Sequence, residues 1–178
     1  MTGAPKVDIT ISSDRWRDAL PDATAHATAA AAAAWQAAGQ TPRTGAVAEI
    51  SLLLTDDATV QTLNHRHRAR NRPTNVLSFP LDEHPASSSE PWLVGDVVLA
   101  CETVVGEARA QGKTVADHFR HLVVHGTLHL LGYDHITDRD AAVMERLEVA
   151  ALASLGIADP YRHVEPAPDK TLPRHCAL

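Results

Sequence analysis

The stretch His125-Gly126-Thr127-Leu128-His129-Leu130-Leu131-Gly132-Tyr133-Asp134-His135 decides how this chain is organised. His125 and His129 are four residues apart, so a helix carries them on one face, one turn apart. Gly132 suits the end of that helix, because glycine readily adopts the left-handed conformation of a C-terminal cap. The turn that follows can bring His135 back toward the other two imidazoles.

Three neutral imidazoles with an open fourth position are typical of a catalytic zinc site. We therefore predict that His125, His129 and His135 bind one Zn²⁺ per chain. His121 lies one helical turn before His125. It is either a spare ligand or, as we favour, a residue that supports the site or faces solvent. Asp134 is the nearest acidic residue, and it either orients a ligand imidazole or the bound water, or belongs to a solvated turn.

Composition limits the class of protein. With 178 residues, 44% hydrophobic and 21% charged, the chain is expected to form one ordinary globular domain. Its net charge of −6 means that contact with a polyanion must come from a local basic patch. The two cysteines lie far apart, which argues for a reducing compartment and against cysteine ligands.

The chain shows no sign of export or membrane insertion. Residues 1–6 contain one lysine with no apolar run behind it, so no signal peptide is expected. The alanine-rich stretch 23–38 is too short and too weakly apolar to cross a bilayer. We therefore expect a cytoplasmic protein.

The hydrophobic pattern predicts an α+β fold, a small mixed β-sheet of about four strands covered by about five helices, with the metal site on a central helix. Predicted strands span residues 7–11, 46–54, 76–80 and 94–100, and predicted helices span residues 23–38, 58–65, 102–111, 115–131 and 139–155. In the last helix the predicted core positions are Ala142, Val143, Leu147, Ala150 and Ala151. Residues 1–159 are expected to form a single domain, and residues 160–178 a disordered tail.

Arginine occupies every second position from Arg66 through Arg68 and Arg70 to Arg72. If the stretch is extended, the four guanidinium groups lie on one side. A solvated basic loop is the interpretation we favour for three of the four. A guanidinium also suits bidentate contact with phosphate and stays charged at any working pH. If the fold brings this cluster to the metal, a phosphodiester substrate is expected.

The metal by itself does not select a substrate, since zinc serves peptide, amide and phosphodiester hydrolysis alike. Zinc proteases with the HExxH motif carry a glutamate directly after the first histidine as general base. Here that position is Gly126, so a proteolytic mechanism of that kind lacks its base.

Residues 125–135, HGTLHLLGYDH, resemble the HGxLHLxGYDH signature of the YbeY family of bacterial endoribonucleases. Leu63-Asn64 followed by Arg68, and then PTNVLSFP at residues 73–80, resemble the family's second motif, and residues 95–98, GDVV, resemble its third. The order and spacing agree over roughly residues 45–155. His67 departs from the aromatic residue that often precedes the family's arginine.

This resemblance implies an α+β fold with zinc held by His125, His129 and His135. It implies metal-dependent endonucleolytic cleavage of single-stranded RNA in 16S rRNA 3′-end maturation, ribosome biogenesis and ribosome quality control. The expected partners are rRNA and the small ribosomal subunit, with neither DNA nor a membrane.

The resemblance also makes Arg68 the catalytic arginine, which holds the scissile phosphate and stabilises its developing charge. Arg66, Arg70 and Arg72 would steer the RNA strand. Attack by water and attack by the ribose 2′-hydroxyl both stay open. Two other functions also stay open: a metal-dependent amidase or protease, and a non-catalytic, zinc-containing ribosome-assembly or RNA-binding module.

Overall fold

The computed structural model describes residues 3–41, 46–81, 87 and 89–162. Within these residues one mixed sheet contains four strands: β1 (Lys6–Ile11), β2 (Ala48–Thr55), β3 (Val76–Pro80) and β4 (Trp92–Ala100). Their order is β1-β2-β4-β3, with β1, β2 and β4 parallel and β3 antiparallel to β4. The predicted α+β class with a mixed sheet is confirmed, and β3 forms one edge.

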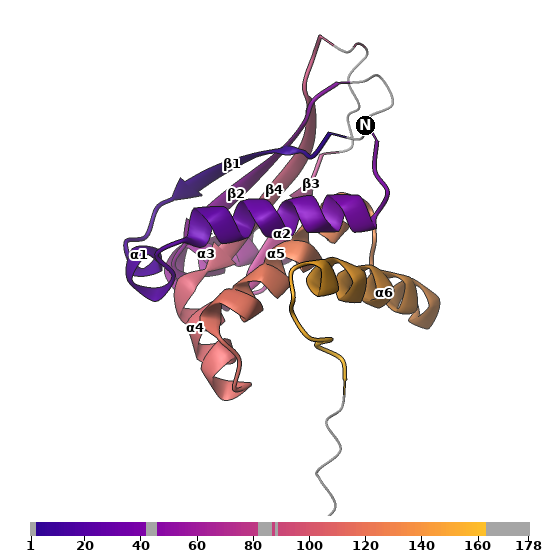
Figure 1. Cartoon of the computed structure of the whole chain (residues 1–178). Coiled ribbons are helices and arrows are strands. Elements are labelled where there is room, and N and C mark those ends of the chain that lie inside the picture. Colours follow the sequence, from indigo (N-terminus) through magenta and orange to yellow (C-terminus); the bar gives the residue numbers. More distant parts are fainter. Residues whose placement is uncertain (1–2, 42–45, 82–86, 88, 163–178) are drawn as a thin grey trace, which may run out of the picture.

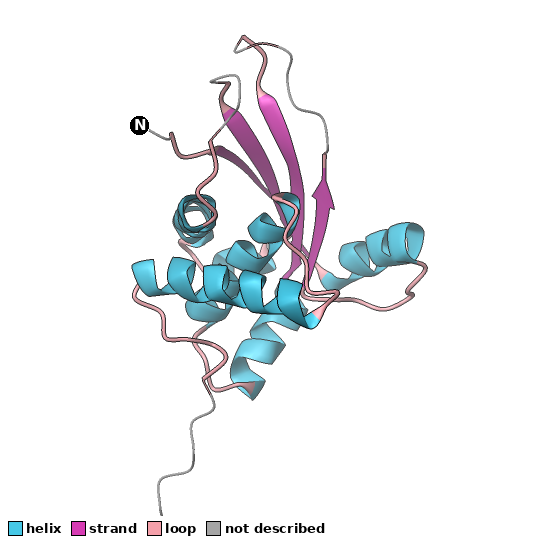
Figure 2. Ribbon diagram, turned by 90° about the vertical axis from the view of Figure 1, so that its right-hand side faces the viewer, coloured by secondary structure: helices cyan, strands magenta, loops and turns pink. Residues whose placement is uncertain are grey.

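Helices cover the two faces of the sheet unequally (Figures 1 and 2). Helix α5 (Val115–Leu130) lies across β3 and β4 on one face, where α2 (Ala23–Ala37) and α6 (Asp138–Ser154) pack against it. On the other face, α3 (Asp57–Arg68) packs against β4. Two further helices, α1 (Arg15–Ala19) and α4 (Cys101–Ala110), contact one another.

The core has a part on each face of the sheet. The larger part lies under α2, α5 and α6, and alternate residues of β2 (Ile50, Leu52 and Leu54) belong to it. The smaller part lies under α3 and contains Val60, Leu77, Val98 and Ala100. Edge strand β3 therefore has α3 on one face and α5 on the other.

Helix α5 begins and ends as its sequence predicts. The side chain of Thr114 accepts a hydrogen bond from the amide of Asp117 at 3.0 Å, which caps the N-terminus. Gly132 has φ +87°. The amides of Gly132 and Tyr133 donate to the carbonyls of His129 and Leu128, both at 3.1 Å. This is a Schellman motif, and it turns the chain back toward the helix.

The arginine stretch is not extended as a whole, so the condition under which its four guanidinium groups would share one side is not met. Helix α3 continues to Arg68, so Arg66 and Arg68 are helical and only Arg70 and Arg72 follow it. The helix ends at Ala69, which takes the left-handed conformation with φ 54°. Because no glycine marks this end, the sequence contains no clear signal for it. The predicted helix for this reason ended too early, near residue 65.

The predicted core face of α6 is also partly wrong. Ala142 and Ala150 are exposed. The buried residues of the helix are Met144, Glu148, Ala151 and Leu152. Their spacing of four, three and one follows a helical stripe, and a glutamate lies in the middle of it.

Helix α1 was not predicted, because five residues without a capping signal give little periodicity. It is held by Trp16, which is fully buried and whose indole N–H donates to the carbonyl of Thr55 at 2.9 Å. In the part of the chain described here, no helix is long and apolar enough to cross a membrane. Of the predicted tail, residues 160–162 are described and residues 163–178 lie outside the described residues.

Candidate metal centre

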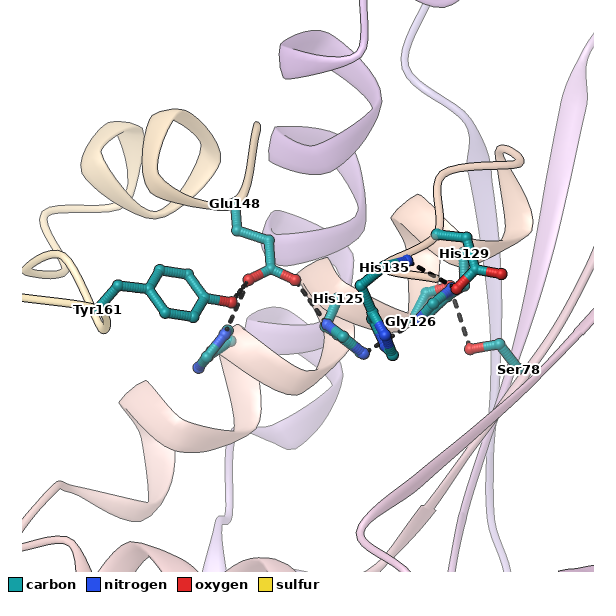
Figure 3. A network of polar contacts seen from close by, with 9 residues as sticks. Ser78, His125, Gly126, His129, His135, Glu148 and Tyr161 are labelled. Carbon is teal, nitrogen blue, oxygen red and sulfur yellow. Dashed lines mark hydrogen bonds and ion pairs between the residues drawn. The ribbon is translucent and has the colours of Figure 1, made fainter. Parts of the chain in front are cut away.

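The three histidines of the central motif meet at the end of α5 (Figure 3). One ring nitrogen from each of His125, His129 and His135 lies within 4.8 Å of the other two. The Nε2 atoms of His125 and His129 are 3.0 Å apart. Zinc–nitrogen bonds of about 2.0–2.1 Å place tetrahedral nitrogen ligands about 3.3 Å apart. The arrangement therefore fits a metal ion, and the predicted convergence of the three side chains is confirmed.

The protonation state also suits a metal. Burial is the main cause that lowers the pKa of His129, and positive charge on His125 or His135 would lower it further. His129 is therefore neutral at neutral pH, and an imidazole binds metal in its neutral form. His135 is exposed, so the site is open toward solvent on the side of the loop between α5 and α6.

A buried carboxylate that the sequence analysis missed contacts this cluster. Glu148 of α6 is 1% exposed, and its Oε1 lies 2.5 Å from Nδ1 of His125. Its Oε2 accepts from Nε2 of His121 at 3.3 Å and from the hydroxyl of Tyr161. Burial would raise the pKa of Glu148, but the hydrogen bonds from His121, His125 and Tyr161 outweigh it and hold the pKa at about 2.

The ionised Glu148 determines what His125 can do. A carboxylate only accepts hydrogen bonds, so in the neutral form of His125 the proton lies on Nδ1 and the lone pair on Nε2, the atom that faces His129. His121 points to the same carboxylate, which agrees with a supporting role rather than with a fourth ligand. The signal for Glu148 in the sequence was its place between Met144 and Leu152 on a buried stripe, where glutamate is rare unless paired.

The side chain of Asp134 contacts the backbone of the turn rather than an imidazole. Its Oδ1 accepts from the amide of His135 at 2.7 Å. No imidazole hydrogen bonds to it in the described part of the chain. The aspartate thus shapes the turn that presents His135.

Gly126 lies where α5 packs tightly against the sheet. A Cβ atom at this position would lie 2.8 Å from Cγ1 of Val97 and 3.2 Å from Oγ of Ser78. The hydroxyl of Ser78 donates to the carbonyl of Gly126 at 3.2 Å, as Figure 3 shows. The side of α5 that a residue here would face is filled by β3 and β4, so position 126 has no room for a carboxylate base.

The arginines lie apart from the histidines. Arg66, Arg68, Arg70 and Arg72 are exposed. Among the described residues, none of their guanidinium groups has a hydrogen bond or an ion pair. Arg68 ends α3 on one face of the sheet, whereas the histidines lie with α5 on the other, and edge strand β3 runs between them.

Asn64 holds the chain that follows α3. Its side chain is buried, and its Nδ2 donates to the carbonyl of Arg72 at 2.8 Å. Its own carbonyl accepts from the amide of Arg70 at 3.3 Å. His67 packs edge-on against Phe79 of β3, with ring centroids 5.1 Å apart. The imidazole thus makes an aromatic contact at the position where the motif often has an aromatic residue.

Comparison with known proteins points to one family. Residues 9–156 match the profile of the family described as "Endoribonuclease YbeY". The proteins of that name from Paramagnetospirillum magneticum and Azorhizobium caulinodans are 51% and 50% identical to this chain. These alignments cover 90% and 88% of this chain, and 98% and 96% of the two relatives. The solution structure of TM1509 from Thermotoga maritima aligns with 88% of this chain and 99% of the TM1509 chain. The two sequences are 19% identical over this alignment, and the TM-score is 0.48.

The profile match runs from residue 9, within β1, to beyond the end of α6, and the two relatives align over nearly their whole length. The chain belongs to the YbeY family of endoribonucleases.

Proposed function

We propose that this chain is a zinc-dependent endoribonuclease that cleaves single-stranded RNA. The observation that carries the proposal is the convergence of His125, His129 and His135, with the Nε2 atoms of the first two turned toward each other. Family membership supports the choice of RNA, since its relatives are named endoribonucleases. We further propose that it acts in the cytoplasm on 16S rRNA 3′ ends, in ribosome biogenesis and quality control, with the small ribosomal subunit as partner.

His125, His129 and His135 would hold Zn²⁺, which supplies Lewis acidity toward a phosphoryl oxygen and lowers the pKa of a bound water to about 7. Glu148 keeps the proton of His125 on Nδ1, so that Nε2 stays available. Asp134 holds the turn that carries His135. The proposed ligands would thus be positioned by helix α5, by its contact with Glu148 of α6 and by the turn after α5.

Arg68 is proposed to bind the scissile phosphate and to neutralise its non-bridging oxygens. Its guanidinium is exposed and has no partner within the described residues, so it is available to a ligand. Arg66, Arg70 and Arg72 would bind neighbouring phosphates. An RNA strand that reaches both groups has to pass over edge strand β3.

The amidase or protease alternative is disfavoured by Gly126. In this structure the side of α5 at that residue is closed by Val97 and Ser78, so no general base can stand there. The non-catalytic alternative predicts RNA binding without cleavage.

The test compares wild-type protein with His129→Ala, Arg68→Ala and the control Arg17→Ala. Arg17 lies in α1, is exposed, and pairs with Asp14 only at the surface. Zinc is determined by elemental analysis, and cleavage of a single-stranded RNA is followed on the same preparations.

We expect His129→Ala to lose zinc and cleavage. Arg68→Ala should keep zinc and lose cleavage, and Arg17→Ala should match wild type. If both site variants cut as well as wild type, the nuclease activity belongs to a contaminant. If wild-type protein binds RNA but never cuts it, with or without zinc, the assembly-module alternative is correct.

A further inference from the structure

Glu148 is the buried centre of a hydrogen-bond network that joins three segments of the chain (Figure 3). His121 and His125 approach it from successive turns of α5, and Tyr161 approaches it from the segment after α6. A buried carboxylate is costly unless its oxygens are hydrogen bonded. Here both oxygens have partners.

We propose that Glu148 is a positioning residue of the metal centre and that Tyr161 holds Glu148 in place. The inference rests on the proposed metal site. The hydrogen bond to Nδ1 of His125 fixes both the tautomer and the rotation of that ring, so that Nε2 points to the position between the three histidines. Glu148 thereby acts through His125 and need not touch metal or substrate.

Packing alone does not account for a glutamate at this position. Met144, Ala151 and Leu152 fill the rest of the same stripe with apolar side chains. An apolar residue at 148 would fill the interface without the cost of burying a charge. The hydrogen bond to Nδ1 of His125 explains why a carboxylate occupies position 148.

Tyr161 is placed by a fixed turn of backbone. The amide of Ile157 donates to the carbonyl of Leu152 at 2.9 Å, and the amide of Tyr161 donates to Oδ1 of Asp159 at 2.8 Å. The phenol ring meets the His121 ring edge to face, with centroids 6.1 Å apart. The segment after α6 therefore belongs to the support of the metal centre, although it contains no ligand.

The test measures zinc affinity of the full chain by competition with a chromogenic chelator, with Zn²⁺ alone as the probe. Glu148→Gln keeps the shape of the side chain and removes its charge. Tyr161→Phe removes only the hydroxyl. Glu145→Gln is the matched control, because Glu145 is on the same helix and is exposed.

We expect Glu148→Gln to weaken zinc binding about 10- to 100-fold, as is usual for residues that orient a ligand. Tyr161→Phe should weaken it by about tenfold, the low end of that range, and Glu145→Gln should leave it unchanged. A second readout needs no metal: in ¹⁵N spectra of zinc-free protein, His125 should be protonated at Nδ1 in wild type and should populate both tautomers in Glu148→Gln.

Three outcomes decide the matter without any RNA assay. Weakened zinc binding together with a mixed tautomer supports the proposal. If Glu148→Gln and Tyr161→Phe bind zinc as wild type does and only lose thermal stability, Glu148 is purely structural and the proposal is wrong. If wild-type protein does not bind zinc, the proposed metal site is wrong and this inference is wrong as well. The proposed function is tested separately: a protein that binds zinc normally but does not cleave RNA would contradict that function and leave this inference standing.

Discussion

At position 126 the absence of a side chain lets helix α5 pack closely against the sheet. In Gly126→Ala the new methyl group would lie 2.8 Å from Val97, so α5 or β4 has to shift. Overpacking of this kind typically costs about 1–3 kcal/mol. Because alanine is also favoured over glycine within a helix by about 1 kcal/mol, we expect the free energy of unfolding, measured with urea on zinc-free protein, to fall by up to about 2 kcal/mol. Zinc binding should weaken as well, because His125 is the adjacent residue.

Gly106→Ala is the matched control. Gly106 lies in helix α4, and a Cβ atom there would meet no other atom within 4 Å. Since alanine is favoured over glycine in a helix by about 1 kcal/mol, this substitution should stabilise the protein. The two glycine substitutions are thus expected to have opposite signs, and a stabilising effect of both would refute the close contact.

The convergence of the three histidines was predictable from the sequence, whereas the residues that contact them from other helices were not. His125, His129 and Gly132 follow from the period of one helix and from its cap, both of which are local. Glu148 lies on another helix and reaches His125 only because α6 packs against α5. Helical periodicity within α6 could have identified a buried glutamate, but not its partner.

At the scale of elements, the connection from α3 to β3 presents the arginines, and Asn64 holds it. Asn64→Ala removes the donor to the carbonyl of Arg72 and leaves a gap at a buried position. Loss of such a bond typically costs about 1–3 kcal/mol. We expect destabilisation in that range on urea unfolding, faster amide exchange at residues 70–72, and weaker RNA binding with unchanged zinc content.

Gln61→Ala serves as the comparison for Asn64→Ala. Gln61 donates to Oδ1 of Asn71 at 2.9 Å in the same connection, but at an exposed position. Water can replace that bond, so stability and RNA binding should change little. Equal losses in both variants would mean that Asn64 has no special part in holding the arginines.

The end of α3 shows where local sequence signals run out. At its N-terminus the helix has a clear cap, because the side chain of Asp56 accepts a hydrogen bond from the amide of Thr59 at 2.8 Å. The C-terminal end has no such signal, because Ala69 takes a conformation that glycine usually supplies. The predicted helix therefore ended near residue 65, before Arg66 and Arg68, whereas α3 continues to Arg68.

At the scale of the whole molecule, the α+β class and the mixed sheet followed from the order of strands and helices. The parallel pairing of β2 with β4 joins segments that are far apart in the chain, and a local sequence pattern does not predict it. The consequence for function is that the arginines and the histidines lie on opposite faces of the sheet.

The buried side chain of His118 links α5 to α4 and, through Glu107, to the residue just before β3. His118 of α5 is 4% exposed, and its Nε2 lies 2.8 Å from Oε2 of Glu107 in α4. Glu107 also accepts from Nδ2 of Asn75 at 3.0 Å, just before β3. Nδ1 of His118 is buried and has no hydrogen-bond partner. A second proton on this ring would therefore be buried without an acceptor.

Stability should for this reason fall in mild acid. Burial lowers the pKa of His118, and the charges of His121 and Lys113 act in the same direction, against Glu107, which raises it. The unfolded chain takes up this proton below about pH 6.5, while the folded protein resists it until lower pH. Stability attributable to His118 is therefore complete above about pH 6.5 and is lost as the pH falls toward the native pKa, by at most about 1.4 kcal/mol per pH unit.

His118→Gln keeps a donor toward Glu107 but cannot titrate. With zinc removed by a chelator, the free energy of unfolding of wild type should fall more steeply between about pH 7 and pH 5 than that of His118→Gln. His65→Gln, an exposed position on α3, should retain the wild-type slope. If the free energies of unfolding of wild type and His118→Gln change with pH in parallel across this range, His118 does not resist protonation. Its burial then has no effect on stability in acid.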